Sequence, residues 1–290
     1  MVKQILDYTD EEFTQLVKTI VEKGSTVVYG QNLTRKQLAE VCARMGKVEE
    51  LDYFMNPKDT PQISIVSGAV VDGKPIGMFG PTELEWHCNG AGRYNFEEIC
   101  VGLYCVEECI DTVLSIVNQR SSFEDLPEEE KEYYRNIDIH LNNEGDRARI
   151  WRNDGVYSKA YENVGEQNFN TSSKDYYGET IDRRPLVAKH PVDGKEYFYP
   201  NLIYLYKAYY RDGNGAEVED FDAFYKKLRS VILQSQYMVH HVFRKGDLLF
   251  MDQLLTSHRR SAVKNKDRQL WRTAFDYSKA VTDYKPVIFE

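Results

Sequence analysis

The order of strand-like and helix-like segments is the feature that most constrains how this chain can fold. Helix-like segments gather in the first third and return at 221–236, whereas β-rich segments occur at 25–29, 99–106 and 112–117 and repeatedly after residue 237. A parallel, doubly wound sheet needs regularly alternating βαβ units, and this chain has no such rhythm. Strands at both ends of the core favour an antiparallel sandwich. We therefore expect a mainly β fold of jelly-roll type with surrounding helices.

The starts of the early helices are marked by capping boxes. Thr9 with Glu12, and Thr34 with Gln37, pair a hydroxyl with a polar side chain three residues later, so that each satisfies a free backbone amide of the first turn. Apolar residues then recur at helical spacing until a glycine ends each run. A further helix is expected after Pro127, since proline suits the first helical position. These helices would pack outside the sheets.

Length and charge limit the classes of function. The chain has 290 residues, and we expect a single domain over 1–290 with a polar excursion at about 142–184. Lys plus Arg number 37 and Asp plus Glu number 46, so the net charge is −9. This balance argues against a partner that is nucleic acid or an anionic membrane, because phosphate contacts need clustered lysine and arginine. No window approaches ~18 apolar residues, so no membrane-spanning helix is expected.

The cysteines and the N-terminus indicate a cytoplasmic protein. The five cysteines are odd in number and sit in a long chain, which favours reduced thiols over a disulfide framework. Cys105 and Cys109 lack a second Cys/His pair at zinc spacing, so buried core thiols are expected rather than a metal site. The N-terminal residues contain no apolar stretch of signal-peptide length.

Two histidines occupy positions that suit a metal site. His87 and His258 each end an apolar segment, where a strand would reach the mouth of a barrel. Non-haem iron oxygenases bind Fe(II) through two histidines and one carboxylate, with the local pattern His-x-carboxylate and a distant second histidine. Residues two apart in an extended segment share a face, so His87 and residue 89 can reach one ion. Residue 89 is asparagine, so an amide stands where the pattern has a carboxylate.

Arg268 and Arg272 are candidates for binding a carboxylate. An arginine can hold a carboxylate through two parallel charge-assisted hydrogen bonds. Two arginines four apart would be a solvated pair on a helix but would share a face in a strand, and Leu270 and Phe275 favour a strand near the core. Thr112 opens another strand, and its hydroxyl could support the same carboxylate.

Taken together and in order, these motifs resemble the taurine dioxygenase-like (TauD/TfdA) family of Fe(II)/2-oxoglutarate-dependent dioxygenases. The resemblance covers about residues 12–277 and implies a double-stranded β-helix, which is a jelly roll. It is carried by residues 24–30, 63–67, 72–77, 85–87, 185–191 with Gly194, 246–249, His258, and Arg268 with Arg272.

The resemblance also implies roles for individual residues. His87 and His258 would ligate Fe(II), with Asn89 as a weak ligand, while Thr112 and Arg268 would hold the distal carboxylate of 2-oxoglutarate. Arg272 would contact an acidic group of the substrate or support the co-substrate site. With O2 as oxidant, the implied reaction decarboxylates 2-oxoglutarate to succinate and CO2. It oxidises, usually by hydroxylation, an unactivated C–H bond of a small molecule.

Asn89 leaves three interpretations open. An active oxygenase would use the amide oxygen, or a water in its place, as a weak ligand. A halogenase on the same scaffold would leave this position to chloride, although asparagine is larger than the glycine or alanine of halogenating relatives. The third is a binding protein without turnover, or an engineered Asp-to-Asn change. Glu85 precedes His87 where the family carboxylate follows it, and Cys88 should point away from the metal, so neither is expected to replace the carboxylate.

The substrate is expected to be small and polar, such as an amino acid or a related acid. Arg93 follows a glycine-rich segment and would lie either on a substrate loop or on a solvated one, and His190 is expected to shape a loop rather than to catalyse. A cluster of six tyrosines would serve sheet packing, a subunit interface in a homo-oligomer, or an aromatic wall for the substrate. These are Tyr197, Tyr199, Tyr204, Tyr206, Tyr209 and Tyr210.

Overall fold

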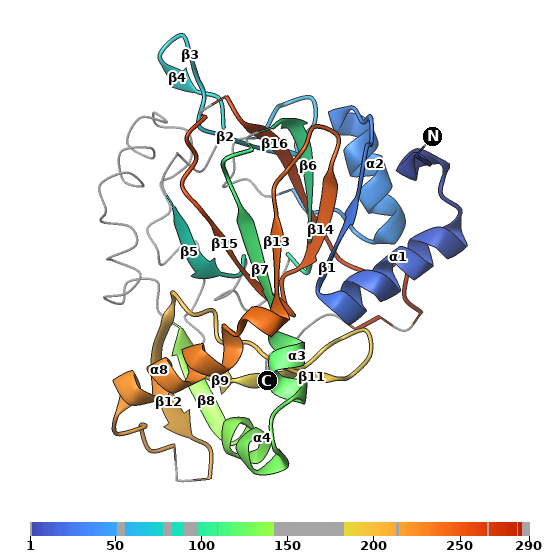
Figure 1. Ribbon diagram of the computed structural model, residues 1–290. Coiled ribbons are helices and arrows are strands. Elements are labelled where there is room, and N and C mark those ends of the chain that lie inside the picture. The colour runs from blue at the N-terminus through green and yellow to red at the C-terminus, as the bar shows by residue number, and fades with distance from the viewer. Residues whose placement is uncertain are drawn as a thin grey trace.

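Two antiparallel sheets form the centre of the molecule. The computed structural model describes residues 2–50, 56–77, 83–89, 98–108, 110–141, 183–212, 215–265, 267–282 and 284–285. The five-stranded sheet has the order β1 (Ser25–Val28), β14 (Leu248–Asp252), β6 (Cys100–Glu107), β16 (Gln269–Phe275) and β2 (Ser64–Ser67). The four-stranded sheet has the order β13 (Met238–His241), β7 (Leu114–Asn118), β15 (Thr256–Arg260) and β5 (Leu84–His87). The sheets lie together in the upper half of Figure 1 and confirm the expected jelly roll.

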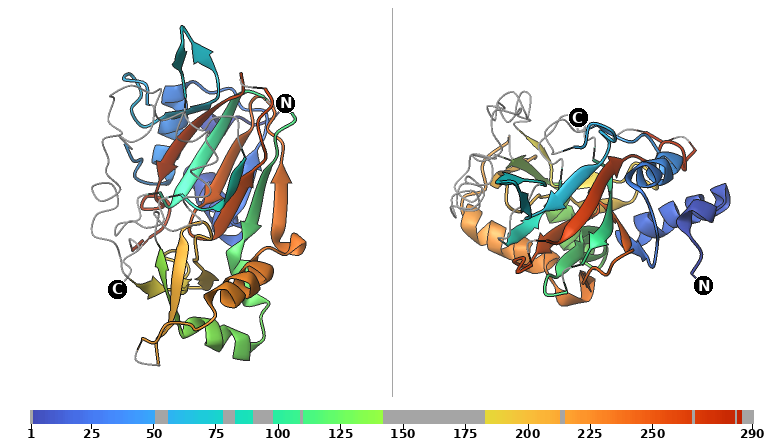
Figure 2. Two further views of the ribbon diagram at one scale, coloured as in Figure 1. Left: turned by 90° about the vertical axis from the view of Figure 1, so that its left-hand side faces the viewer. Right: turned by 90° about the horizontal axis from the view of Figure 1, so that it is seen from above.

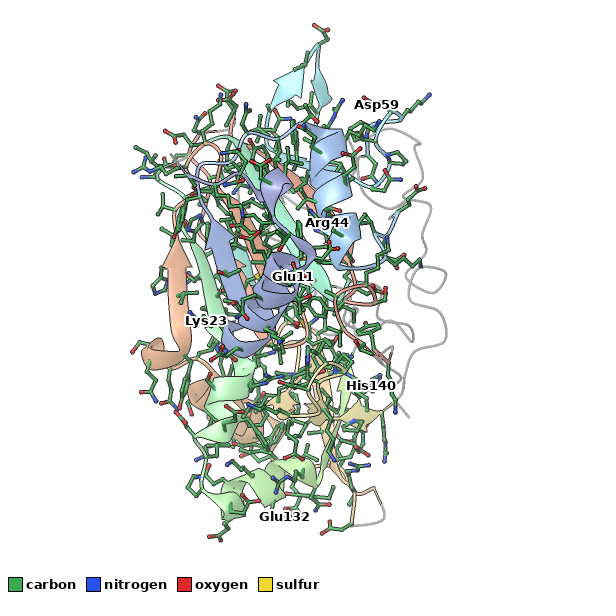
Figure 3. All side chains as sticks on the ribbon, turned by 90° about the vertical axis from the view of Figure 1, so that its right-hand side faces the viewer. Glu11, Lys23, Arg44, Asp59, Glu132 and His140 are labelled. Carbon is green, nitrogen blue, oxygen red and sulfur yellow. The ribbon has the colours of Figure 1, made fainter. Side chains whose placement is uncertain are left out.

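Two early helices cover the outer side of the five-stranded sheet. α1 (Asp10–Lys23) packs on β1 and β14, and α2 (Arg35–Met45) packs on β16 (Figures 1 and 2). Both expected capping boxes are present, which confirms the predicted helix starts. Arg44, labelled in Figure 3, links the helices, since its guanidinium donates to the Tyr8 carbonyl at 2.7 Å and lies 4.2 Å from the centre of the Phe13 ring. Arg44 thus joins the two helices, and each helix packs on the sheet through its own contacts.

Smaller elements complete the lower half of Figure 1. Helices α3, α4 and α8 accompany a three-stranded sheet β12–β8–β9 and the pair β10–β11, while the hairpin β3–β4 projects from the opposite end. Their bounds, with two short 3-10 turns, are α3 Gln119–Glu124, α4 Glu128–Arg135, α8 Phe221–Ile232, β8 Ile137–Leu141, β9 Arg184–Pro185, β10 Val187–Lys189, β11 Glu196–Phe198, β12 Leu205–Tyr210, β3 Val70–Val71, β4 Lys74–Pro75, η1 Ile5–Asp7 and η2 Ser235–Tyr237.

Several sequence expectations differ in detail from the structure. The helix expected over 221–236 ends at Ile232, because Gln234 has an extended backbone (φ −86°, ψ 140°) before the turn η2. The hairpin tip expected at Asp72 and Gly73 is confirmed, with φ of 50° and 76°. Most of the polar excursion predicted at about 142–184 lies outside the described residues. In the part of the chain that is described, no helix is long and apolar enough to cross a bilayer.

Alternation along the strands produces a cavity between the sheets. In β16, Leu270 and Arg272 line this cavity, whereas Trp271 and Phe275 belong to the main hydrophobic cluster on the other side of the strand. Successive side chains of a strand point to opposite faces, so one face of each central strand points into the interior. The fold therefore gathers side chains from strands far apart in sequence around one internal space.

Candidate functional site

The cavity between the two sheets holds most of the residues that the sequence singled out. Its lining is apolar on most sides, with polar side chains gathered among the aliphatic ones. The described residues that line it are Val66, Leu84, His87, Asn89, Val101, Leu103, Thr112, Leu114, Phe243, Met251, His258, Arg260, Arg268, Leu270 and Arg272. Such a lining, mostly apolar with a few convergent polar groups, is typical of a small-molecule site.

The two candidate metal-binding histidines come from neighbouring strands. β5 and β15 pair antiparallel, and His87 and His258 are directly opposite each other in the register. Their ring centroids are 4.2 Å apart, and only 8% and 7% of the two residues is exposed. Opposite residues of paired strands have Cβ atoms about 4.5–5.5 Å apart, so this register alone brings both imidazoles within reach of one ion.

Hydrogen bonding and burial determine the protonation state of both imidazoles. Nδ1 of His87 lies 2.6 Å from the carbonyl oxygen of Glu85, which can only accept, so Nδ1 carries the proton and Nε2 the lone pair. Burial, with a contribution from the positive charge of Arg260, lowers the pKa of His87 to about 4. Burial, with the positive charge of Arg272, holds the pKa of His258 well below its usual value. Both rings are therefore neutral at physiological pH, as metal ligation requires.

A buried nitrogen of His258 supports the same assignment. In the described part of the chain, Nδ1 of His258 is inaccessible to solvent and has no hydrogen-bond partner. A buried polar atom without a partner is costly unless a ligand satisfies it. No group of three or more His, Cys, Asp or Glu side chains in the described residues is placed to hold a metal ion. The metal donors that line the cavity are two imidazoles, of His87 and His258, and the amide of Asn89, and such nitrogen and oxygen donors suit a divalent metal ion such as Fe(II).

Asn89 lies in the turn after β5 and lines the cavity beside His87. Two buried amides hold the backbone of this turn. The N–H of Asn89 donates to Oε1 of Gln253 at 2.9 Å, and Nδ2 of Asn201 donates to the carbonyl of Cys88 at 3.0 Å. Gln253 and Asn201 are both fully buried. The position of residue 89 is thus fixed by the turn that precedes β15, the strand that carries His258.

Neither neighbour of His87 takes the place of the carboxylate. Glu85 pairs with Arg229 at 3.4 Å and with Arg259 at 3.8 Å, on the half-exposed outer side of β5. Cys88 packs in the main hydrophobic cluster, and burial raises the pKa of its thiol to about 12. A thiol that remains protonated is a poor metal ligand.

Three buried arginines line the cavity. Arg272 lies in β16 and Arg268 lies just before it, and both line the cavity, as does Thr112 just before β7. Part of the Arg272 guanidinium is already occupied by a carboxylate, because its Nη2 donates to Oε2 of the buried Glu98. Arg260 was not identified from the sequence as a cavity residue. Arg260 lies two residues after His258 in β15, and because residues two apart in a strand share a face, the spacing could have predicted its place.

Other candidates lie elsewhere. Arg93 is outside the described residues. His190 is buried, and its Nε2 lies 3.1 Å from Oδ2 of the fully buried Asp252, in a network that holds the turn before β15. None of the six clustered tyrosines is among the described residues that line the cavity. Tyr197 and Tyr199 are fully buried in the core, while 40% of Tyr206 is exposed.

Comparison with known proteins shows the family of the chain and supports its fold. No curated protein matches the sequence. A solved taurine dioxygenase from Burkholderia xenovorans superposes with a TM-score of 0.66 and 15% identity, covering 94% of this chain and 83% of that one. AAD-2, solved with Mn(II) and N-oxalylglycine, superposes with a TM-score of 0.66 and 16% identity, covering 94% of this chain and 92% of that one.

Because these solved structures are only 15% and 16% identical to the chain, they support the jelly-roll fold alone. The family is shown by a match of the sequence to a family model. The model of the family described as taurine catabolism dioxygenase TauD, TfdA family matches residues 2–274, which is nearly the whole chain. The chain is accordingly an enzyme of the non-haem Fe(II)/2-oxoglutarate dioxygenase class, which uses a metal, 2-oxoglutarate and O2. The chain belongs to the TauD/TfdA family of dioxygenases.

Proposed function

We propose that this enzyme hydroxylates an unactivated C–H bond of a small polar substrate, such as an amino acid or a related acid, at the cavity between its two sheets. The observation that carries the proposal is the pairing of His87 with His258 across β5 and β15, as two neutral, buried imidazoles facing a cavity lined with arginines. Fe(II) bound there would supply the activation of O2 that drives decarboxylation of 2-oxoglutarate to succinate and CO2.

Different side chains of this cavity would bind the metal, the co-substrate and the substrate. His87 and His258 would hold the metal through ring nitrogens, with the Asn89 amide or a water beside it as the third donor. Arg268 and Thr112 would bind the distal carboxylate of 2-oxoglutarate through charge-assisted hydrogen bonds. The aliphatic lining would exclude water, which strengthens these bonds and protects the reaction from side products. Arg272, with its Glu98 partner, would lie at the substrate or co-substrate carboxylate.

The experiment that tests this proposal measures succinate. Protein loaded with Fe(II) in air, with ascorbate and 2-oxoglutarate, should form succinate, and a substrate should be recognised by the increase in succinate that it causes and by a product heavier by one oxygen atom. His258→Ala should abolish both. A chlorinated product that depends on chloride would favour the halogenase alternative. No succinate with any candidate would favour a ligand-binding protein, and either result would contradict hydroxylation.

We also propose that the protein acts in the cytoplasm on small molecules and not on nucleic acid. The four described cysteines, Cys42, Cys88, Cys100 and Cys105, are all buried free thiols, as expected under reducing conditions. The net charge of −9 supports the absence of a nucleic-acid partner. A homo-oligomer stays a prediction, which light scattering of the purified protein would test.

A further inference from the structure

One large aromatic side chain lines the cavity between the sheets. Among the described lining residues, Phe243 is the only phenylalanine, tyrosine or tryptophan, and it is 4% exposed. It lies in the connection 242–247, which crosses from β13 in the four-stranded sheet to β14 in the five-stranded sheet (Figure 1). In the antiparallel pair of β13 and β7, His241 lies opposite Leu114. Each further residue along the first strand matches one residue back along the second, so this register places Phe243 level with Thr112.

The five-stranded sheet brings the same connection close to Arg268. The N–H of Cys105 donates to the carbonyl of Asp247 at 2.8 Å. Cys105 in β6 lies opposite Leu270 in β16, which is two residues after Arg268. Phe243, Cys105 and Leu270 pack in one hydrophobic cluster. Phe243 therefore closes the cavity at the end that holds both residues proposed to bind the distal carboxylate of 2-oxoglutarate.

The ring of Phe243 is held from the side and from behind. The ring of His241 packs against it edge to face, with centroids 4.6 Å apart and an angle of 85° between the planes. Nε2 of His241 lies 3.1 Å from Oδ2 of the buried Asp247. The same oxygen accepts the N–H of Arg244 at 2.9 Å, so the turn that follows Phe243 is also fixed. A side chain packed in this way cannot move aside for a longer ligand without disturbing its neighbours.

We propose that Phe243 sets the length of the 2-oxo acid that the enzyme accepts as co-substrate. 2-Oxoadipate is one methylene longer than 2-oxoglutarate, and its distal carboxylate would need the space that the Phe243 ring fills. The inference rests on the proposed function, because it uses the carboxylate site assigned there to Thr112 and Arg268. It assigns Phe243 as a specificity-determining residue and not as a ligand. One methylene in an apolar pocket changes selectivity by about 10- to 200-fold.

The test is titration calorimetry of the Mn(II)-loaded protein with each of the two acids, under nitrogen and without turnover. In the wild type, the Kd for 2-oxoadipate should exceed the Kd for 2-oxoglutarate by at least about tenfold. Phe243→Leu removes part of the end wall but keeps it apolar. The ratio of the two Kd values should therefore fall to about threefold or less, mainly because 2-oxoadipate binds more tightly.

A matched control makes the same substitution on the other face of the five-stranded sheet. Phe250 in β14 is fully buried in the main hydrophobic cluster and is not among the described residues that line the cavity. Phe250→Leu should lower stability and leave the ratio of the two Kd values at the wild-type level. A fall equal to that of Phe243→Leu would mean that any loosening of the core relaxes the selection, and it would overturn the inference.

A second variant carries the test if circular dichroism shows that Phe243→Leu does not fold. Phe243→Met replaces the ring with a flexible chain that fills irregular space, so it disturbs packing less, and the ratio should fall at least about threefold. An unchanged ratio in the folded variant, or a wild type that binds both acids within twofold, would refute the role of Phe243 and leave the proposed function intact. A wild type that binds Mn(II) but not 2-oxoglutarate would refute the proposed co-substrate site, and the inference with it.

Discussion

Gln253→Met is expected to lower both the stability of the fold and its affinity for a divalent metal. Gln253 is fully buried in the turn between β14 and β15, where its Oε1 accepts from the N–H of Asn89 at 2.9 Å and its Nε2 donates to the carbonyl of Met251 at 3.2 Å. Methionine has nearly the same length and volume but offers neither group. The substitution therefore removes two hydrogen bonds with little change in packing.

The size of the effect follows from these two bonds. A neutral hydrogen bond contributes about 1 kcal/mol, and a buried group left without a partner costs about 1–3 kcal/mol. The free energy of unfolding should therefore fall by about 2–4 kcal/mol. Because the lost acceptor holds residue 89 against the strand that carries His258, we expect the Kd for Mn(II) to rise about three- to tenfold, which is about 0.7–1.4 kcal/mol.

The assay pairs urea unfolding with Mn(II) titration calorimetry and uses the same substitution elsewhere as its control. Gln31 is 4% exposed, and its Oε1 accepts from the N–H of Ile5 at 2.6 Å while its Nε2 donates to the carbonyl of Tyr29 at 2.7 Å. Gln31→Met should cost similar stability and leave metal affinity unchanged. If Gln253→Met weakens Mn(II) binding no more than Gln31→Met does, the hydrogen bond from Asn89 to Gln253 has no role in metal binding.

Three further predictions follow from the cavity and its supports. Arg268→Met should weaken 2-oxoglutarate binding about a hundredfold in calorimetry without weakening Mn(II) binding, and equal losses of both would contradict its assignment. The metal-free protein should lose stability as the pH falls from 6.5 to about 4, because the unfolded chain binds a proton that buried His87 does not. The loss in the free energy of unfolding that is due to His87 is about 3 kcal/mol, and it should be absent when His87→Gln is unfolded in urea over the same pH range. Asp252→Asn should lower the free energy of unfolding by about 2–4 kcal/mol, since Asp252 is fully buried and interacts with His190 and Tyr277; an unchanged urea midpoint would refute this.

Local patterns in the sequence predicted those parts of the site that depend on short-range geometry. The four-residue spacing predicted that Arg268 and Arg272 would lie on the same side, and both line the cavity although Arg268 lies just before β16. The two-residue spacing of His87 and Asn89 likewise predicted that both would reach one space. The capping boxes located the starts of α1 and α2 for the same reason, because each is complete within four residues. What these features share is that a few adjacent residues determine them.

The supports of the site depend on contacts that no local pattern specifies. Gln253 bonds to Asn89 across 164 positions, Asn201 to Cys88 across 113, and Arg272 to Glu98 across 174. The strand order of the two sheets determines which distant residues meet, and hydrophobic periodicity in the sequence does not reveal that order. The tyrosine cluster shows the same limit, because period-two spacing is shared by core strands and pocket walls.

We propose that His87, His258 and Arg268 form one Fe(II) and 2-oxoglutarate site despite the asparagine at residue 89. The most direct test is an anaerobic titration of the Fe(II)-loaded protein with 2-oxoglutarate, followed by visible absorption. Chelation of the metal by 2-oxoglutarate produces a charge-transfer band, which should grow to saturation with one equivalent in the wild type, vanish in His258→Ala and need far more 2-oxoglutarate in Arg268→Met. No band in the wild type, or an undiminished band in His258→Ala, would contradict the account.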